Sequence, residues 1–127
     1  MHENNLFEYA VIRVVPQVER EEFLNVGVIL YCPKLKFLQC LCALDEERLC
    51  SFSSRVGPDE LREHLHSYAA ICRGSRTGGP IAQLDMPSRF RWLTATRSTV
   101  VQSSKVHPGL CIDPLETLEK LYSQLVL

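Results

Sequence analysis

VGVILYCPKLKFLQCLCAL, residues 26–44, contains two apolar runs separated by a short break with a proline and two lysines. Val26 to Tyr31 and Phe37 to Leu44 each have the length and apolar character of a strand. Residues 32–36 are too few for a crossover connection, so an antiparallel hairpin is expected. The hairpin predicts a sheet that is buried on at least one side.

Two further segments have strand character. Tyr9 to Val15 is mostly β-branched or aromatic, and it stops at Pro16, which cannot donate to a ladder. Thr99 to Ser104 adds a fourth candidate through two adjacent valines.

The helical signals are strongest after residue 57. Pro58 opens a helix that ends at Gly74 and places apolar side chains on one face. Asp113 and Pro114 open a closing helix with a capping box to Glu116. Shorter helices are expected at 45–52 and at 87–93. The two predicted apolar stripes are Leu61, Leu65, Tyr68 and Cys72, and Leu115, Leu118, Leu121, Tyr122 and Leu125.

These elements predict a single α+β domain over residues 1–127. The chain is 46% hydrophobic, which is enough for one core. We expect a small, mostly antiparallel sheet of about four strands, packed by two to four helices. The glycine-rich stretch near residues 74–79 has no periodicity and predicts a flexible loop.

Charge and cysteine content exclude several classes of protein. The formal net charge of −1 disfavours bulk electrostatic capture of nucleic acid or membrane. No apolar run approaches the ~20 residues that cross a bilayer, and no leader pattern is present. We therefore expect a cytoplasmic protein whose six cysteines are reduced thiols. Between residues 73 and 105 the only acid is Asp85, against six basic residues: Arg73, Arg76, Arg89, Arg91, Arg97 and Lys105.

Metal, thiol and nucleotide motifs are weak. No C-x2-C pair occurs, and His64 and His66 point some ~200° apart on a helix, so no metal is expected. Cys111, four residues after His107, fits a thiol nucleophile in outline, but its apolar neighbours favour a packing role. Neither standard phosphate-binding glycine motif is present, and no cofactor is expected.

The segment SRFRWLTATRST, residues 88–99, is the strongest candidate for a binding site. Arg89, Arg91 and Arg97 alternate with Phe90 and Trp92, a mixture that grips phosphates or stacks on aromatic partners. The alternative is that the aromatic residues anchor the segment while the arginines are solvated or pair with Glu19, Glu21 and Glu22. This second interpretation is the more common one for such a segment.

The stretch EREEFLNVGVIL, residues 19–30, contains a candidate base. Glu22 could act as a general base only with a raised pKa and a partner in reach, which the sequence does not show. Asn25 can turn its amide onto the local backbone, and Glu22 can reach an arginine at the end of the sheet. Gly27 leaves space for a neighbouring chain to approach closely.

Three blocks of the chain resemble the small bacterial proteins grouped as domain of unknown function 3037. These blocks are YAVIRVVP (9–16), EFLNVGVIL (22–30) and RFRWLTATRSTVVQSSKVHPGL (89–110), closed by Asp113-Pro114 and a leucine-rich helix. The resemblance implies a stand-alone cytoplasmic α+β protein with no known reaction, and a gene often found beside those of HipA-like kinase-fold proteins. It implies the signature positions Glu22, Asn25, Gly27, Arg91, Trp92, Thr94, Arg97, Ser98, Gln102, His107 and Gly109.

Three functional hypotheses follow. The first is an accessory protein that presents Arg89, Arg91, Trp92 and Arg97 to a protein partner such as a HipA-like kinase. The second is a phosphate- or nucleotide-handling enzyme in which Arg91, Arg97 and His107 bind a phosphate-containing ligand and Glu22 is the base. Weak nucleic-acid binding through the basic 89–107 segment is a third possibility, which the near-neutral charge disfavours.

Overall fold

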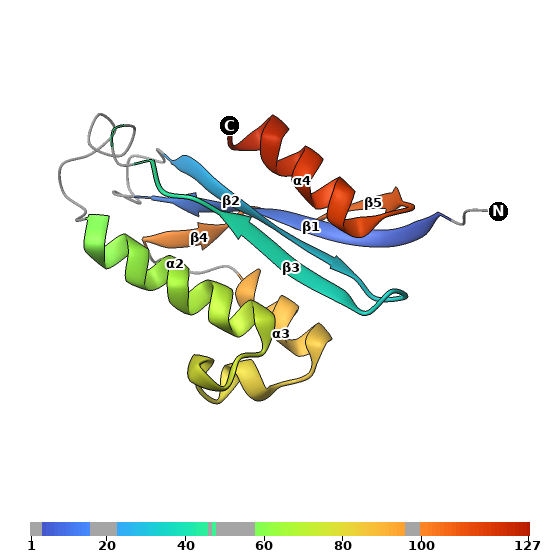
Figure 1. Cartoon of the computed structure of the whole chain (residues 1–127), viewed down its shortest axis with the longest axis horizontal. Helices are drawn as coiled ribbons and strands as arrows, with labels where there is room; N and C mark the ends of the chain where they lie inside the picture. The colour runs from blue at the N-terminus through green and yellow to red at the C-terminus, as the bar shows by residue number, and fades with distance from the viewer. Residues whose placement is uncertain (1–3, 16–22, 46, 48–57, 96–99) are drawn as a thin grey trace.

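A computed structural model describes residues 4–15, 23–45, 47, 58–95 and 100–127. Within these ranges the chain forms an antiparallel sheet packed by helices, which confirms the predicted α+β class (Figure 1). The sheet has five strands rather than about four. The elements are β1 (Asn5–Val14), β2 (Leu24–Cys32), β3 (Phe37–Cys42), α2 (Pro58–Arg73), η2 (Arg76–Gly78), η3 (Ile81–Gln83), α3 (Met86–Leu93), β4 (Val101–Ser103), β5 (His107–Cys111) and α4 (Pro114–Leu125).

The sheet is built around β1. It has the order β3-β2-β1, and both β4 and β5 pair with the other side of β1. β4 lies opposite Ile12 to Val14 and β5 lies opposite Asn5 to Tyr9. Residues 101–111 therefore form one interrupted edge of the sheet.

Between β4 and β5, Ser104 continues the hydrogen bonding of this edge to β1. Its backbone N–H donates to the Val11 carbonyl at 2.8 Å, and its hydroxyl oxygen accepts the Val11 N–H at 2.8 Å. The side chain of Ser104 is buried, so these bonds satisfy polar groups that would otherwise be costly to bury.

β5 is the strand that the sequence does not predict. It contains Pro108 and Gly109, two residues that are depleted in strands. The structure explains the glycine, because a Cβ at Gly109 would lie 2.5 Å from the Cζ of Phe7. The ring of Phe7 thus occupies the space of the missing side chain on β5.

The predicted hairpin of β2 and β3 is present, and its glycine has the expected packing role. Gly27 lies opposite Cys42. A Cβ at Gly27 would lie 2.6 Å from both the Cβ of Cys42 and the carbonyl oxygen of Leu41. Because one of these atoms belongs to the backbone, only glycine lets the two strands approach this closely.

The two faces of the sheet carry separate cores. Helices α2 and α3 cover one face, and α4 covers the other (Figure 1). The first core includes Ala10, Ile12, Val14, Ile29, Tyr31, Leu61, Leu65, Tyr68, Cys72 and Phe90. The second comprises Phe7, Val28, Leu30, Cys32, Cys111, Leu118 and Val126.

The two predicted helical stripes differ in outcome. All four stripe residues of α2 are buried, as expected. In α4 only Leu118 is fully buried, whereas Leu115 is 43% exposed and Leu125 is 36% exposed. Leu121 and Tyr122 are partly buried and pack with Leu118 on the second core, so the predicted stripe is present at its centre and exposed at its two ends.

Two other predicted segments lie in the connections of the chain. The glycine-rich residues 74–79, expected as a flexible loop, contain η2, which Ser75 caps by accepting the Thr77 N–H. The short helix expected at 45–52 lies almost entirely outside the described residues. None of the helices that the structure describes is both long and apolar enough to cross a membrane.

Candidate binding site

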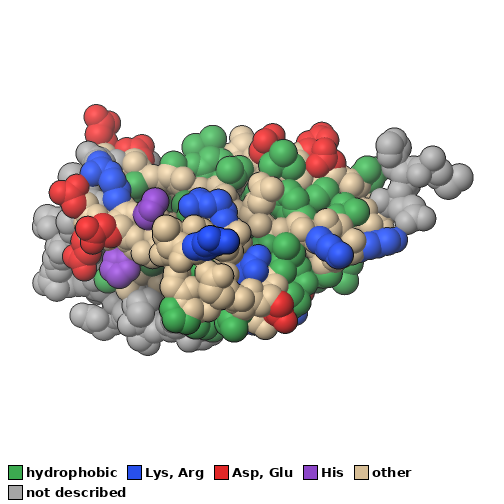
Figure 2. All heavy atoms as spheres, turned by 60° about the horizontal axis from the view of Figure 1, so that its bottom comes forward, with side chains coloured by type: hydrophobic (Ala, Val, Ile, Leu, Met, Phe, Trp, Pro, Cys, Tyr) green, Lys and Arg blue, Asp and Glu red, His purple; other side chains and the backbone are tan. Residues whose placement is uncertain are grey.

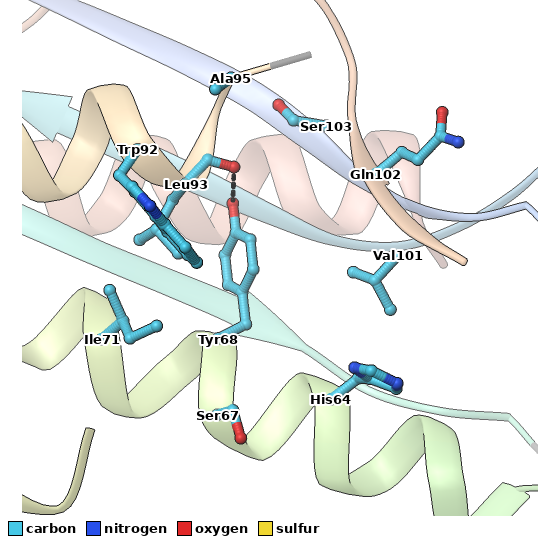
Figure 3. Close-up of a pocket in the computed structure, with 10 residues that line it drawn as sticks. All are labelled: His64, Ser67, Tyr68, Ile71, Trp92, Leu93, Ala95, Val101, Gln102 and Ser103. Carbon is cyan, nitrogen blue, oxygen red and sulfur yellow. Dashed lines mark hydrogen bonds between the residues drawn. The ribbon is translucent and has the colours of Figure 1, made fainter. Parts of the chain in front are cut away.

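A cleft of about 200 Å³ opens between α2, the end of α3 and β4 (Figure 3). Trp92 and Tyr68 stand on one side of it, and His64 and Val101 stand on the other. The lining combines aromatic and aliphatic surface with a few polar groups, which is the usual composition of a binding site. The full lining is His64, Ser67, Tyr68, Ile71, Trp92, Leu93, Ala95, Val101, Gln102 and Ser103.

α3 positions Trp92, and its start is fixed by a cap. Asp85 is the N-cap and accepts the Ser88 N–H at 2.9 Å. Hydrogen bonds from the side chain and backbone of Ser88 lower the pKa of Asp85. Phe90 is fully buried under the helix and packs on Tyr31 with ring centroids 5.2 Å apart. The helix is therefore held at its start and at its centre.

Arg89 is a structural side chain. Its Nη1 donates to the Leu84 carbonyl at 2.7 Å. Its guanidinium also lies against Gly74, where a Cβ would be 3.2 Å from Cζ. Gly74 has a φ of +69°, so glycine is favoured there for conformation as well as for space. Arg89 thus ties α3 to the end of α2 and is not among the residues that line the cleft.

Arg91 forms a two-point ion pair with β1. Its Nη1 and Nη2 donate to the two carboxylate oxygens of Glu8 at 3.2 and 3.1 Å. This partner is not among the acids at 19–22 that the sequence suggested. Glu8 also lies about 20 Å along β1 from Val14, where β1 meets Leu24 at the other end of the sheet. The guanidinium of Arg91 is therefore engaged within the fold.

Trp92 and Thr94 have different roles from each other. Trp92 is 37% exposed and faces the cleft beside Tyr68, whose hydroxyl donates to the Leu93 carbonyl at 3.4 Å. Thr94 ends the helix, because its hydroxyl donates to the Phe90 carbonyl at 2.8 Å. Of the α3 residues that the sequence selects, Trp92 is the one that lines the cleft.

Gln102 and Asn25 belong to the opposite face of the sheet. Both lie opposite Arg13, on either side of β1, and the guanidinium of Arg13 stacks on Phe23 at 4.1 Å. The Gln102 side chain points away from the cleft, so its backbone contributes to the lining (Figure 3). Asn25 donates from Nδ2 to the Leu125 carbonyl at 3.1 Å, which ties β2 to the end of α4.

His107 does not join Arg91. It lies opposite Tyr9, and the two rings are 5.3 Å apart. Tyr9 packs against the core under α4, whereas Arg91 reaches Glu8 from the side of α3. The two proposed phosphate ligands are therefore on opposite faces of the sheet. Glu22, Arg97 and Ser98 lie outside the described residues.

The cysteines have the properties of core residues. Burial, followed by the nearby thiol of Cys32, raises the pKa of Cys111. Cys111 and His107 are four residues apart along one strand, about 13 Å, so they form no catalytic pair. The pKa of Cys40 is raised to about 12: its hydrogen bond with Cys42 lowers the value, but the bond with Cys72 and burial outweigh it. Among the described residues no cluster of His, Cys, Asp and Glu could hold a metal ion.

The α2 side of the cleft was not predicted from the sequence. His64, Ser67, Tyr68 and Ile71 follow the spacing i, i+3, i+4 and i+7, which places them on one helical face. That spacing was a usable signal. It overlaps the buried stripe at Tyr68, so the two helical faces share a residue.

The described residues form a small α+β fold with a cleft lined partly by aromatic side chains. A family model described as Protein of unknown function (DUF3037) matches residues 9–126, and the chain belongs to this family. No curated protein sequence and no solved structure matches the chain.

Proposed function

We propose that this protein is an accessory protein that binds another protein through Trp92 and the adjoining cleft. The supporting observation is that Trp92, 37% exposed, stands on a helix whose neighbouring side chains are fixed into the fold. An exposed tryptophan on a rigid support is a frequent binding hot spot, because little side-chain entropy is lost when it is covered.

The size of the cleft favours a side chain over a nucleotide. Its volume of about 200 Å³ is below the ~300 Å³ at which small-molecule pockets usually begin. An apolar or aromatic side chain of a partner could fill the space beside Trp92, with His64 and Ser67 offering polar contacts at the rim.

The surface around the cleft is electrically asymmetric. Figure 2 shows acidic and histidine side chains toward one end of this face and basic side chains near its middle. The asymmetry follows α2, which has Asp59 and Glu60 in its first turn and Arg73 in its last. Such a gradient would orient a partner of complementary charge.

The partner to test first is a HipA-like kinase-fold protein, as the family resemblance suggests. We place the complex in the bacterial cytoplasm, where the cysteines would remain reduced. The experiment is co-purification of a HipA-like kinase with the wild-type chain and with Trp92→Ala. Wild type should retain the kinase, and Trp92→Ala should lose it with little change in melting temperature.

A matched control is Phe23→Ala, which removes another half-exposed aromatic residue, one that stacks on Arg13. This variant should retain the kinase. If both variants lose the kinase equally, a specific role for Trp92 is contradicted. If the wild type also fails to retain the kinase, this partner is rejected.

The phosphate-handling alternative has less support. Arg91 is paired with Glu8, and His107 lies on the other face of the sheet. We therefore expect a flat melting temperature against inorganic phosphate and a nucleotide panel at low salt. A ligand-dependent rise that follows mass action would revive this alternative.

A further inference from the structure

The outer edge of β5 is a second candidate interaction surface, at which backbone groups have no partner strand among the described residues. β5 pairs with β1 on one side, and no strand among the described residues pairs with its other side. Pro108 lies opposite Glu8 and has no N–H, so it is tolerated where that group would point outward. Leu110, two residues on, then also directs its N–H and C=O outward.

Exposed aliphatic side chains surround this edge. Leu110 is 66% exposed, Leu6 directly opposite it is 57% exposed, and Ile112 is 54% exposed. They lie beyond Glu8, the β1 residue to which Arg91 of α3 donates. α3 therefore leaves this end of its face uncovered, and an apolar cluster at a strand edge is typical of an interaction surface.

The charges on either side of Leu110 have opposite sign. Lys105 precedes it, whereas Asp113 and Glu116 follow it. A two-fold axis at Leu110 would bring residue 107 of one copy opposite residue 113 of the other, since both are three positions from the axis. The same rotation would place the basic side of each copy along the acidic side of the other. The segment is therefore complementary to itself in charge.

We propose that the outer edge of β5 pairs antiparallel with β5 of a second copy, about a two-fold axis at Leu110. Leu110 of each copy would exchange N–H···O=C bonds with its counterpart. The Ile112 N–H of each copy would reach the Pro108 carbonyl of the other, an arrangement that requires no N–H from proline. The sheets of the two copies would then join into one.

Side chains support this register on both faces. On the open face the cross-strand neighbours are Leu110 with Leu110 and Pro108 with Ile112, so each gains an apolar contact. On the face of α4 His107 lies opposite Asp113, the N-cap of that helix. The contact is short, so the dimer should depend on concentration.

The first test is sedimentation velocity of the full chain from about 1 μM to about 1 mM, the range that separates weak dimers from monomers. Wild type should shift from monomer to dimer within this range. Leu110→Lys should remain monomeric, because the two-fold axis would set two lysines against each other.

The matched control is Leu84→Lys. Leu84 is also an exposed leucine, at 42%, but it lies next to α3 and away from the β5 edge. It should dimerise like wild type. A wild type that stays monomeric throughout overturns the proposal, as does equal loss of dimer in both variants.

The second test exchanges charges across the axis. Lys105→Glu and Glu116→Lys should each weaken the dimer, and the double variant should recover it, because the segments before and after Leu110 again carry opposite charges. Failure of the double variant to recover while its melting temperature equals that of the single variants would reject the proposed register. Hydrogen exchange at the Leu110 amide should slow as concentration rises, and an unchanged rate in a sample that sediments as a dimer would place the contact elsewhere.

Discussion

The two faces of the sheet are covered in different ways. On the first face, α3 is fastened by a buried Phe90, a two-point ion pair from Arg91 and a guanidinium contact from Arg89. On the second face, α4 has one fully buried side chain, Leu118, and a bond from Asn25 to its last turn. The face that carries the cleft is thus the more firmly held, and this favours a preorganised binding site.

The largest expected effect comes from removing the anchor on each face. Phe90→Ala should lower the free energy of unfolding by about 3–5 kcal/mol, and Leu118→Ala by about 2–5 kcal/mol, through lost burial and a cavity. Urea unfolding measures both values. The difference between the faces should appear in the emission of Trp92, the only tryptophan in the chain.

In Phe90→Ala the folded-state emission of Trp92 should shift to longer wavelength, because α3 loses the ring beneath it. In Leu118→Ala the emission should stay as in wild type, since α4 lies across the sheet from the cleft. Equal shifts of the Trp92 emission in the two variants would show that the two faces of the sheet are not independent.

A smaller effect is expected from the ion pair between α3 and β1. The side chains of Arg91 and Glu8 are 60% and 24% exposed, so solvent screens the attraction. Two-point geometry raises the value above that of a loose surface pair. A double-mutant cycle with Arg91→Ala and Glu8→Ala should give a coupling of about 0.5–1 kcal/mol in urea unfolding.

Salt gives the control for this cycle. The coupling should fall when ionic strength is raised, because the pair is partly exposed. A coupling near zero at low salt would mean that Arg91 does not fasten α3, and Trp92 would then rest on Phe90 and Arg89 alone.

Local signals in the sequence were enough for most of the fold. The hairpin, the capped start of α4 and the stripe of α2 were predicted because each depends on neighbouring residues. β5 was not predicted because Pro108 and Gly109 are unfavourable in most strands. Pro108 is tolerated here at a sheet edge, and the ring of Phe7 occupies the space beside Gly109. Both conditions exist only in the folded chain.

The candidate site was harder to predict than the fold. The composition of the segment around Trp92 was enough to select this residue. The partner of Arg91, however, is Glu8, 83 positions away, and no local pattern indicates this pairing. The apolar period of α4 likewise could not show that Leu115 and Leu125, at the two ends of its stripe, remain exposed. Long-range pairing decides which arginines are engaged, and a single sequence does not encode that pairing in a readable form.

The smallest expected effect concerns the cap of α3. Because hydrogen bonds from Ser88 lower the pKa of Asp85, the charged form is favoured in the folded chain. The resulting stability is present above the unfolded pKa, near 3.9, and is lost as pH falls through the lower folded pKa. Asp85→Asn keeps a capping oxygen but lacks the charge.

Thermal unfolding of wild type and Asp85→Asn should therefore differ slightly at neutral pH and converge below about pH 4. The sign is fixed, since wild type is the more stable at neutral pH, where its carboxylate also faces the start of a helix. A difference that stays constant from neutral to acidic pH would mean that the charge of Asp85 contributes nothing. The position of α3 would then be fixed by Phe90, Arg89 and Arg91. The firmer attachment of this face of the sheet would depend on packing and guanidinium contacts and not on the charge of the cap.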